Sequence, residues 1–328
     1  MQSMDQQVLD SMCRWAREGC KFALITVART WGSAPRPPGS IMALREDGRV
    51  VGSVSGGCVE DDLIAKVTRE GFGPALPFLL TYGVTQDEAA RFGLPCGGTI
   101  ELMVEPCPDI GMLEALSDSV RRGELTNRTV VVGSRETVLD GARAGDKVVW
   151  DGRALTNVHG PAWRLLIVGA GQTSACLAMM AQALDYRVFV CDPRVEYTGG
   201  WDVTGTTLLS GMPDDAAAAF NLDPHSAVVA LTHDPKLDDL VLLEALKSPA
   251  FYVGALGSRV NSQRRRERLV EHFDVTEEQM ARLHGPVGLP IGSQTPPEIA
   301  VAILAEMTAV RNGAWHKDGL LRQRDRGS

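Results

Sequence analysis

The stretch Arg164-Leu-Leu-Ile-Val-Gly-Ala-Gly-Gln-Thr-Ser174 decides the fold of the second half of this 328-residue chain. Its apolar run, residues 165–168, predicts a strand buried on both faces, as strands of parallel sheets are. Gly169 and Gly171 follow as the first two glycines of a G-x-G-x-x-G turn, and a second apolar run ends at Asp192. In this fingerprint the glycines admit a pyrophosphate, and an acid about 20 residues later binds a ribose hydroxyl. The stretch therefore predicts a Rossmann-like nucleotide site.

Composition and charge are those of an ordinary globular protein, with 44% hydrophobic and 23% charged residues. The net charge of −8 and the pI near 5.3 argue against nucleic acid or an anionic membrane as a partner. No apolar run reaches the roughly 18 residues of a membrane span, and the first residues lack a signal-peptide pattern. Seven cysteines without a C-x-x-C pair favour free thiols in a reducing compartment. We therefore expect a cytoplasmic protein.

Hydrophobic patterning predicts two α/β domains. In the first half, a helix over about residues 5–18 and strands near 22–28, 41–44 and 49–54 indicate a mixed α/β domain. Small hairpins are expected over 136–150, turning at 140–141 and 145–146. After the glycine turn, strands and helices alternate, which is typical of a doubly wound parallel sheet. The polar stretch 151–161 is expected to contain the domain boundary, so the domains are expected to be 1–155 and 162–328.

The stretch Ser55-Gly56-Gly57-Cys58 directly precedes a predicted helix. Glycines before a helix start offer backbone N–H groups to an anion, and a cysteine at that place can have a lowered pKa. The acids at 60–62 would oppose a thiolate, so the net effect on the thiol stays open. The alternative is a plain glycine turn whose acids complement the helix dipole and whose cysteine is a small buried thiol.

A second element of this kind, Cys96-Gly97-Gly98, precedes the next predicted strand. Two such elements favour a shared, thiol-lined anion pocket, in which Cys58 and Cys96 are candidate contacts to molybdenum or to sulfur. Arg36 lies in a proline-rich loop and has the planar fork suited to phosphate, unless it is simply solvated. The other cysteines are expected to be packing residues: Cys13, Cys20, Cys107, Cys176 and Cys191.

Polar residues also follow two later strands of the predicted parallel sheet, at the edge where such sheets bind ligands. His233 and Asp234 either bind a ligand there or only end the strand and cap the next helix. Gly257, Ser258 and Arg259 form a candidate second phosphate cradle.

Two further segments near the last helix carry less specific signals. The arginine-rich run 264–268 is interpreted as a solvated helix face. The glycine-rich segment 284–293 leads into that helix and is a candidate ligand-facing loop.

These motifs, taken together, resemble the XdhC/CoxI family of maturation factors for molybdenum hydroxylases such as xanthine dehydrogenase and carbon monoxide dehydrogenase. The residues Gln172-Thr-Ser174 depart from the His-Val-Ala-like residues expected of the family after the glycine turn. The stretches that carry the resemblance are Gly32–Arg36, Gly52–Glu60, Cys96–Gly98, Gly169–Gly171, Thr232–Asp234, Tyr252–Arg259 and Thr295–Ala300.

The resemblance implies an accessory cofactor chaperone rather than a catalyst. Such a protein binds the molybdenum cofactor, as molybdopterin or its dinucleotide form, while a cysteine desulfurase supplies sulfur. It then delivers the cofactor to an apo molybdenum hydroxylase. A molybdopterin nucleotidyltransferase is a further implied partner, and a homodimer is expected. Two alternatives remain: an NAD(P)-dependent oxidoreductase, supported by Gly169 and Asp192, and a nucleotide-sensing scaffold. A nucleotide such as NAD(P) in the Rossmann half is compatible with each of these interpretations.

Overall fold

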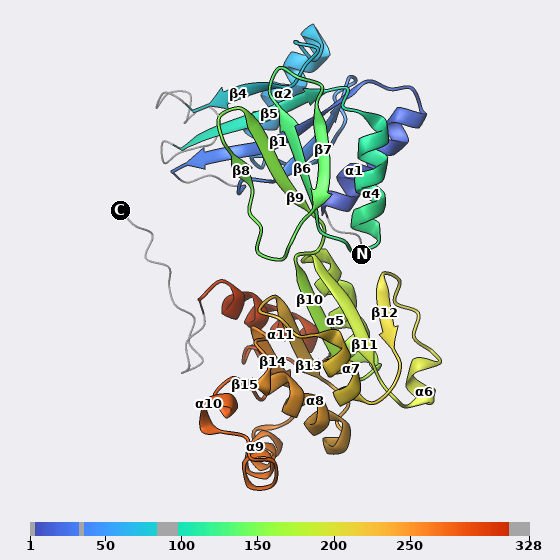
Figure 1. Cartoon of the computed structure of the whole chain (residues 1–328), viewed down its shortest axis with the longest axis vertical. Coiled ribbons are helices and arrows are strands. Elements are labelled where there is room, and N and C mark those ends of the chain that lie inside the picture. The colour runs from blue at the N-terminus through green and yellow to red at the C-terminus, as the bar shows by residue number, and fades with distance from the viewer. Residues whose placement is uncertain (1–3, 33–35, 84–97, 315–328) are drawn as a thin grey trace. The chain divides into compact units, whose positions relative to one another are not determined.

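The computed structural model describes residues 4–32, 36–83 and 98–314, except the side chain of Cys58 (Figure 1). The chain divides into two compact units, one reaching Pro161 and the other beginning at Ala162. Of the predicted site residues, Cys96 and Gly97 lie outside the described residues.

The first unit is built on an antiparallel five-stranded sheet with the order β3-β2-β1-β5-β4. Successive side chains of its central strand enter different cores, because side chains alternate across a sheet. Ile25 packs in a cluster with Leu63, whereas Leu24 packs in a second cluster with Met12 and Leu113. The strands are β1 (Phe22–Trp31), β2 (Ile41–Arg45), β3 (Val50–Gly52), β4 (Phe78–Tyr82) and β5 (Thr99–Pro106), and the helices are α1 (Met4–Arg17), α2 (Cys58–Glu70) and α4 (Ile110–Arg121).

A second antiparallel sheet, with the order β7-β6-β9-β8, completes this unit and corrects the predicted hairpins. The stretch 151–161, in which the sequence placed the domain boundary, contains β9, and the two units divide at its end, between Pro161 and Ala162. Inward-facing Leu155, Asn157 and His159 alternate along that strand, and the Asn157 amide donates to the carbonyl of Gly39 at 3.0 Å. The hairpins join β6 to β7 and β8 to β9, so they do not turn where the sequence indicated. The strands are β6 (Thr126–Val131), β7 (Thr137–Gly141), β8 (Val149–Trp150) and β9 (Ala154–His159).

The second unit contains a parallel six-stranded sheet with the order β12-β11-β10-β13-β14-β15 (Figure 1). Numbered within this unit, the order is 3-2-1-4-5-6, as in dinucleotide-binding doubly wound folds. The predicted α/β class is confirmed, with a Rossmann-like second half. The strands are β10 (Trp163–Val168), β11 (Tyr186–Cys191), β12 (Thr206–Leu209), β13 (Ser226–Ala230), β14 (Tyr252–Ala255) and β15 (Leu283–His284).

Helices cover both faces of the parallel sheet, which explains its continuous apolar strands. Residues of α5 and α11 share one core cluster with the sheet, and residues of α7, α8 and α9 contribute to the other. The loops that follow β10, β13, β14 and β15 therefore gather at the carboxyl edge of one rigid sheet. The helices are α5 (Gln172–Ala183), α6 (Val195–Thr198), α7 (Pro213–Phe220), α8 (Pro235–Lys247), α9 (Arg259–Phe273), α10 (Glu277–Met280) and α11 (Pro296–Arg311).

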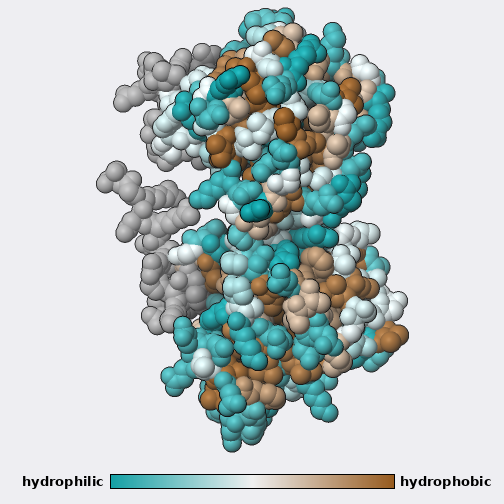
Figure 2. Space-filling model, viewed as in Figure 1, coloured by the Kyte–Doolittle hydropathy of each residue, from teal (hydrophilic) through white to brown (hydrophobic). Residues whose placement is uncertain are grey.

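The surface adds two observations. Within the described residues, every helix is too short or too polar to span a bilayer. On the face drawn in Figure 2, apolar residues lie interspersed with hydrophilic ones in both units. The exposed large apolar side chains of the second unit include Val195, Val260 and Ile291.

Candidate functional site

The loop before α2 forms a nest of backbone amides that Glu60 of the same helix fills. The N–H groups of residues 54, 55, 56 and 57 lie 2.8–3.0 Å from the Glu60 carboxylate. The hydroxyls of Ser53 and Ser55 also donate to it. Burial raises the pKa of Glu60, but the hydrogen bonds from Ser55 and Gly56 outweigh this and hold the pKa well below its usual range. The amides of Gly56 and Gly57, expected to be open to an external phosphate, are therefore occupied by the chain itself.

The other predicted residues of the first unit are only partly described. Arg36 is exposed, and Gly98 is buried ahead of β5. Cys58 is the first residue of α2. Within the described residues, no cluster of three or more His, Cys, Asp or Glu could hold a metal ion. Whether Cys58 and Cys96 contact a cofactor therefore stays a prediction.

The expected packing role holds for four of the five remaining cysteines. Cys13 and Cys191 are buried, and Cys20 and Cys176 pack against core clusters. Burial, with the nearby Asp192 carboxylate, raises the pKa of Cys191 to about 11, so its thiol is protonated at neutral pH. Cys107 is the exception, because it is exposed.

The glycine turn after β10 lies at the switch point of the sheet, because β10 pairs with β11 on one side and β13 on the other. Gly169 has a φ of +109°, and a Cβ there would lie 3.1 Å from the backbone of Leu231 and Thr232. Only glycine fits this approach. Gly171 is the N-cap of α5 and has open space where a Cβ would be.

Asp192 was expected to bind a ribose hydroxyl. In the structure its carboxylate instead forms hydrogen bonds with Ala170 of the glycine turn and with Arg194. One oxygen accepts from the backbone N–H and Nε of Arg194, at 3.1 and 2.8 Å. The other accepts from the Ala170 N–H and from Nη2 of Arg194, at 2.9 and 2.8 Å. Burial raises the pKa of Asp192, but its bonds to Arg194 and Ala170 lower it overall. Since a carboxylate has about four acceptor positions, a ribose hydroxyl would have to displace Arg194.

Asp234 lies in the loop after β13 and caps the next helix, as one of the two sequence interpretations predicted. The Asp234 carboxylate accepts from the backbone N–H of Lys236 at 2.9 Å and is the N-cap of α8. His233 is exposed, with a φ of +62°. It stays at the carboxyl edge, where a ligand can reach it.

The arginine run of α9 is not a solvated face. Arg265 is buried and bridges to Asp238 and Asp239 at 3.0 and 3.3 Å. Arg268 contacts Asp239 at 2.6 Å. Arg266 donates to the carbonyls of residues 280 and 283, at 2.8 and 2.6 Å. Three of the arginines thus attach α9 to neighbouring elements.

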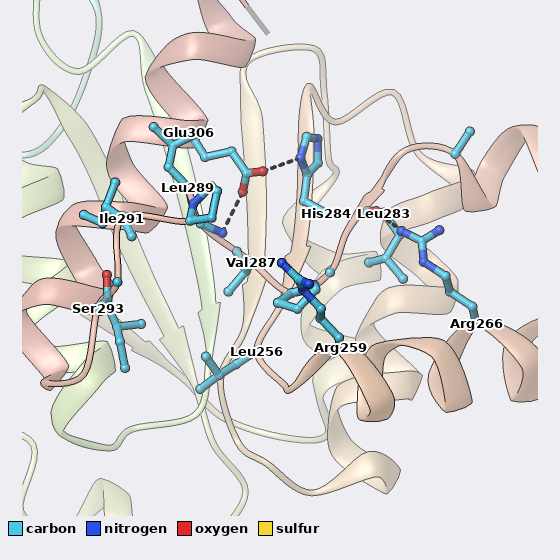
Figure 3. A pocket seen from close by; sticks show the side chains of 18 residues that line it. Leu256, Arg259, Arg266, Leu283, His284, Val287, Leu289, Ile291, Ser293 and Glu306 are labelled. Atoms are coloured by element: carbon cyan, nitrogen blue, oxygen red, sulfur yellow. Dashed lines mark hydrogen bonds and ion pairs between the residues drawn. The ribbon is translucent and has the colours of Figure 1, made fainter. Parts of the chain in front are cut away.

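A cavity of about 850 Å³ opens at the carboxyl edge of β14 and β15 (Figure 3). Leu256 and Arg259 line it from the loop and first turn between β14 and α9. The glycine-rich segment 284–293 forms another wall, and Glu306 reaches it from α11. Of the predicted second phosphate cradle, Arg259 lines this cavity and Gly257 and Ser258 do not, whereas the predicted ligand-facing loop lines it throughout.

A buried hydrogen-bond network forms the inner wall of this cavity. The Glu306 carboxylate lies 3.0 Å from Nδ1 of His284 and accepts from the N–H of Gly288 at 2.7 Å. It also accepts from the Tyr252 hydroxyl, and the Tyr252 ring stacks on His284 at 4.5 Å. Burial raises the pKa of Glu306, yet the contact with His284 lowers it overall. The network holds His284 in one orientation against the cavity.

Sequence reasoning missed Glu306 and Tyr252 as site residues, although one signal was present. The apolar stripe of the last helix includes Ile303 and Val310, and Glu306 lies three and four residues from them. An acid on a buried helix face requires a partner, so this position could have been identified.

The charges of the cavity favour an anion. Its described lining contains two guanidinium groups, Arg259 and Arg266, and a single carboxylate, Glu306. That carboxylate already has three hydrogen-bond partners, which are His284, Tyr252 and Gly288. The guanidinium of Arg266 donates to neutral backbone carbonyls, which leave its positive charge uncompensated.

Two family descriptions match the chain in order. One, the XdhC and CoxI family, matches residues 15–83, and the other, the XdhC Rossmann domain, matches residues 165–307. A protein of Bacillus subtilis, described as a probable xanthine dehydrogenase subunit, is 26% identical over 314 residues, covering 88% of this chain and 92% of that protein. The molybdenum cofactor insertion chaperone PaoD of Escherichia coli is 27% identical over 297 residues, covering 88% of this chain and 83% of PaoD.

A crystal structure agrees over nearly the whole chain. A protein from Bacillus halodurans, described as a xanthine dehydrogenase, is 26% identical and superposes with a TM-score of 0.71. The match covers 96% of this chain and 97% of that one.

Proposed function

The chain belongs to the XdhC and CoxI family, and we propose that it is a molybdenum cofactor chaperone. In this role it binds the cofactor, supports its sulfuration and delivers it to an apo molybdenum hydroxylase of the xanthine or carbon monoxide dehydrogenase type. The cofactor is cargo rather than a catalytic group of this protein. The distant relation to PaoD supports this role.

The observation that carries the proposal is the cavity between β14, α9 and α11. Small-molecule sites typically enclose about 300–1,000 Å³ and combine apolar walls with a few fixed polar groups. This cavity has about 850 Å³, with two arginines and the His284–Glu306 pair among its polar groups. A pterin that carries a phosphate needs both kinds of contact, because its ring edge forms hydrogen bonds and its phosphate is anionic.

The sulfuration part of the proposal concerns Cys58 and Cys96. Thiolates suit both molybdenum and sulfur, and a cysteine desulfurase is the proposed source of that sulfur. We place no catalytic step on this chain. Association of two copies, and contact with a molybdopterin nucleotidyltransferase, remain part of the proposal.

Mass analysis of the molecule retained by the purified chain tests the cargo role. We expect a pterin phosphate, or its dinucleotide form, to copurify from cells that make molybdopterin. Added to an apo-hydroxylase with a desulfurase, the loaded chain should restore activity. If the wild-type chain retains no pterin, the proposal is wrong.

The cysteine part has its own test. The double variant Cys58→Ala and Cys96→Ala should lose activation of the apo-hydroxylase. The control is Cys107→Ala, because Cys107 is an exposed cysteine of the same unit and should be dispensable. Unchanged activation by the double variant would leave the chaperone role standing but remove the cysteines from it.

A nicotinamide nucleotide at the switch point is a second candidate, favoured by the strand order and the glycine turn. Titration with NAD(H) and NADP(H) discriminates, since an oxidoreductase should bind one pair tightly and turn over a substrate. The scaffold alternative predicts instead that deletion of the gene leaves the hydroxylases loaded and sulfurated.

A further inference from the structure

We propose that the start of α9 is a phosphate subsite and that the cavity beside it takes a phosphorylated heterocycle. The phosphate lies against residues 257–262, and the ring extends toward His284. The identity of the ring rests on the proposed function, whereas the phosphate subsite stands on the geometry alone.

The first step is the charge at the start of α9, a helix of 15 residues. Ser258 is its N-cap, and the Ser258 hydroxyl accepts from the N–H of Asn261 at 3.2 Å. Arg259 is the first helical residue, is exposed and lines the cavity. A cation at a helix N-terminus is unfavourable, because the helix dipole is positive there. Within the described residues no carboxylate pairs with Arg259, so an external anion would relieve this repulsion.

The second step is Ser262, whose hydroxyl has no hydrogen-bond partner within the described residues although the residue is only 4% exposed. Its Oγ lies 3.6 Å from where a Cβ on Gly257 would be and 3.4 Å from where a Cβ on Gly285 would be. Gly285 lines the cavity. The hydroxyl therefore points toward the junction between the α9 loop and the cavity. A buried donor without a partner is destabilising, and a phosphate oxygen would satisfy it.

The third step is the rigidity of this loop. Arg265 donates to the carbonyl of Leu256 at 3.1 Å, just ahead of Gly257. The same guanidinium is neutralised by Asp238 and Asp239 of α8. Arg265 thus holds the loop in place, while Arg259 keeps its charge for a ligand. A cradle fixed in this way binds an anion without having to order first.

The other end of the cavity suits a polar ring. His284 lines the cavity and is held by Glu306 on one edge and by the stacked ring of Tyr252 on one face. Figure 3 shows Arg259 and His284 on different walls of this space. A ligand with a phosphate at one end and a hydrogen-bonding ring at the other matches both walls.

The experiment measures binding affinity by calorimetric titration of the full chain. Neopterin is compared with neopterin monophosphate, and inorganic phosphate is compared with buffer alone. We expect the phosphorylated pterin to bind at least about tenfold more tightly, since charge-assisted hydrogen bonds supply that much. R259Q should remove this preference. R264Q is the matched control, because Arg264 is exposed on the same helix and outside the cavity lining, and its affinity should stay within about twofold.

A variant of Ser262 distinguishes an effect on ligand binding from an effect on folding. S262A should weaken the phosphorylated pterin but leave the melting temperature unchanged or raised, because it removes a buried hydroxyl without a partner. Equal affinity for the two pterins in the wild type would overturn the proposal. So would wild-type affinity in both R259Q and S262A.

Failure of this inference is distinguishable from failure of the chaperone role. If R259Q purified from cells retains as much molybdopterin as the wild type, the phosphate subsite is wrong and the chaperone role stands. If the wild type retains none, yet binds neopterin monophosphate through Arg259, the chaperone role is wrong and the subsite stands.

Discussion

The loops before α2 and α9 have similar sequences but differ in the side chains at the start of the helix that follows. Each contains glycine and opens a helix, of 13 residues in α2 and 15 in α9. At the third helical position α2 has Glu60, whose carboxylate turns back and fills the nest of amides. The same position in α9 is Asn261, and Arg259 occupies the first turn. The turn before α2 thus binds a carboxylate of its own chain, whereas we propose that the turn before α9 binds a ligand.

Replacement of Glu60, whose carboxylate fills the nest of amides, should have the largest effect on stability. E60A leaves several amides without an acceptor, and we expect the first unit to lose about 3–4 kcal/mol of unfolding free energy. Sulfate should recover part of this loss by entering the nest. Thermal unfolding with and without sulfate measures both effects. D61A, at an exposed position in the same turn, is the control and should change stability by less than about 0.5 kcal/mol. Full stability in E60A would contradict the assigned role of Glu60.

The equivalent test at the cavity is E306Q. The amide replaces a charged acceptor that binds His284, Tyr252 and Gly288, so we expect a loss of about 2–3 kcal/mol from the second unit. Denaturant unfolding gives the value, and E271Q, an exposed position on α9, serves as the control. A change no larger than that of the control would mean that the network is not stabilising.

The pH dependence of stability should follow from the same carboxyl. The pKa of Glu306 is lower in the folded chain than its ordinary value of 4.5. The unfolded state therefore binds the proton more readily, and the contribution of Glu306 is present above about pH 4.5 and is lost as the pH falls through the folded pKa. The difference in unfolding free energy between wild type and E306Q should shrink on acidification. A difference that stays constant from pH 7 to pH 3 would contradict this.

A glutamate at the third position of α9, where α2 has Glu60, should have the smallest effect on stability and a clear effect on ligand binding. N261E creates the pattern Ser-x-x-Glu at the start of α9, and the new capping box should add about 0.5–1 kcal/mol. Its carboxylate should also occupy the start of the helix and abolish binding of neopterin monophosphate. N261Q keeps the length without the charge and should bind like the wild type. Unimpaired binding in N261E would show that the anion does not use this helix start.

Local patterns predicted most elements of this chain. The helix expected over about residues 5–18 is α1 (Met4–Arg17), and the strand expected near residues 41–44 is β2 (Ile41–Arg45). Strand β9 was missed because its inward positions include Asn157 and His159, which are polar and stable there only through tertiary partners. The interpretation of Arg265 as solvated failed for the same reason, since its partners Asp238 and Asp239 belong to another helix.

By itself, the sequence determined the periodicity of the elements, the doubly wound α/β class implied by strand and helix alternation, and the motifs of the family. These properties are local, because backbone preference and burial pattern are set by neighbours along the chain. Only the tertiary structure decided which polar group meets which. Tyr252 and His284 reach Glu306 across 54 and 22 positions of the chain. Partner choice depends on where side chains meet in space, and this is why the cavity, rather than the glycine turn that identified the fold, became the candidate site.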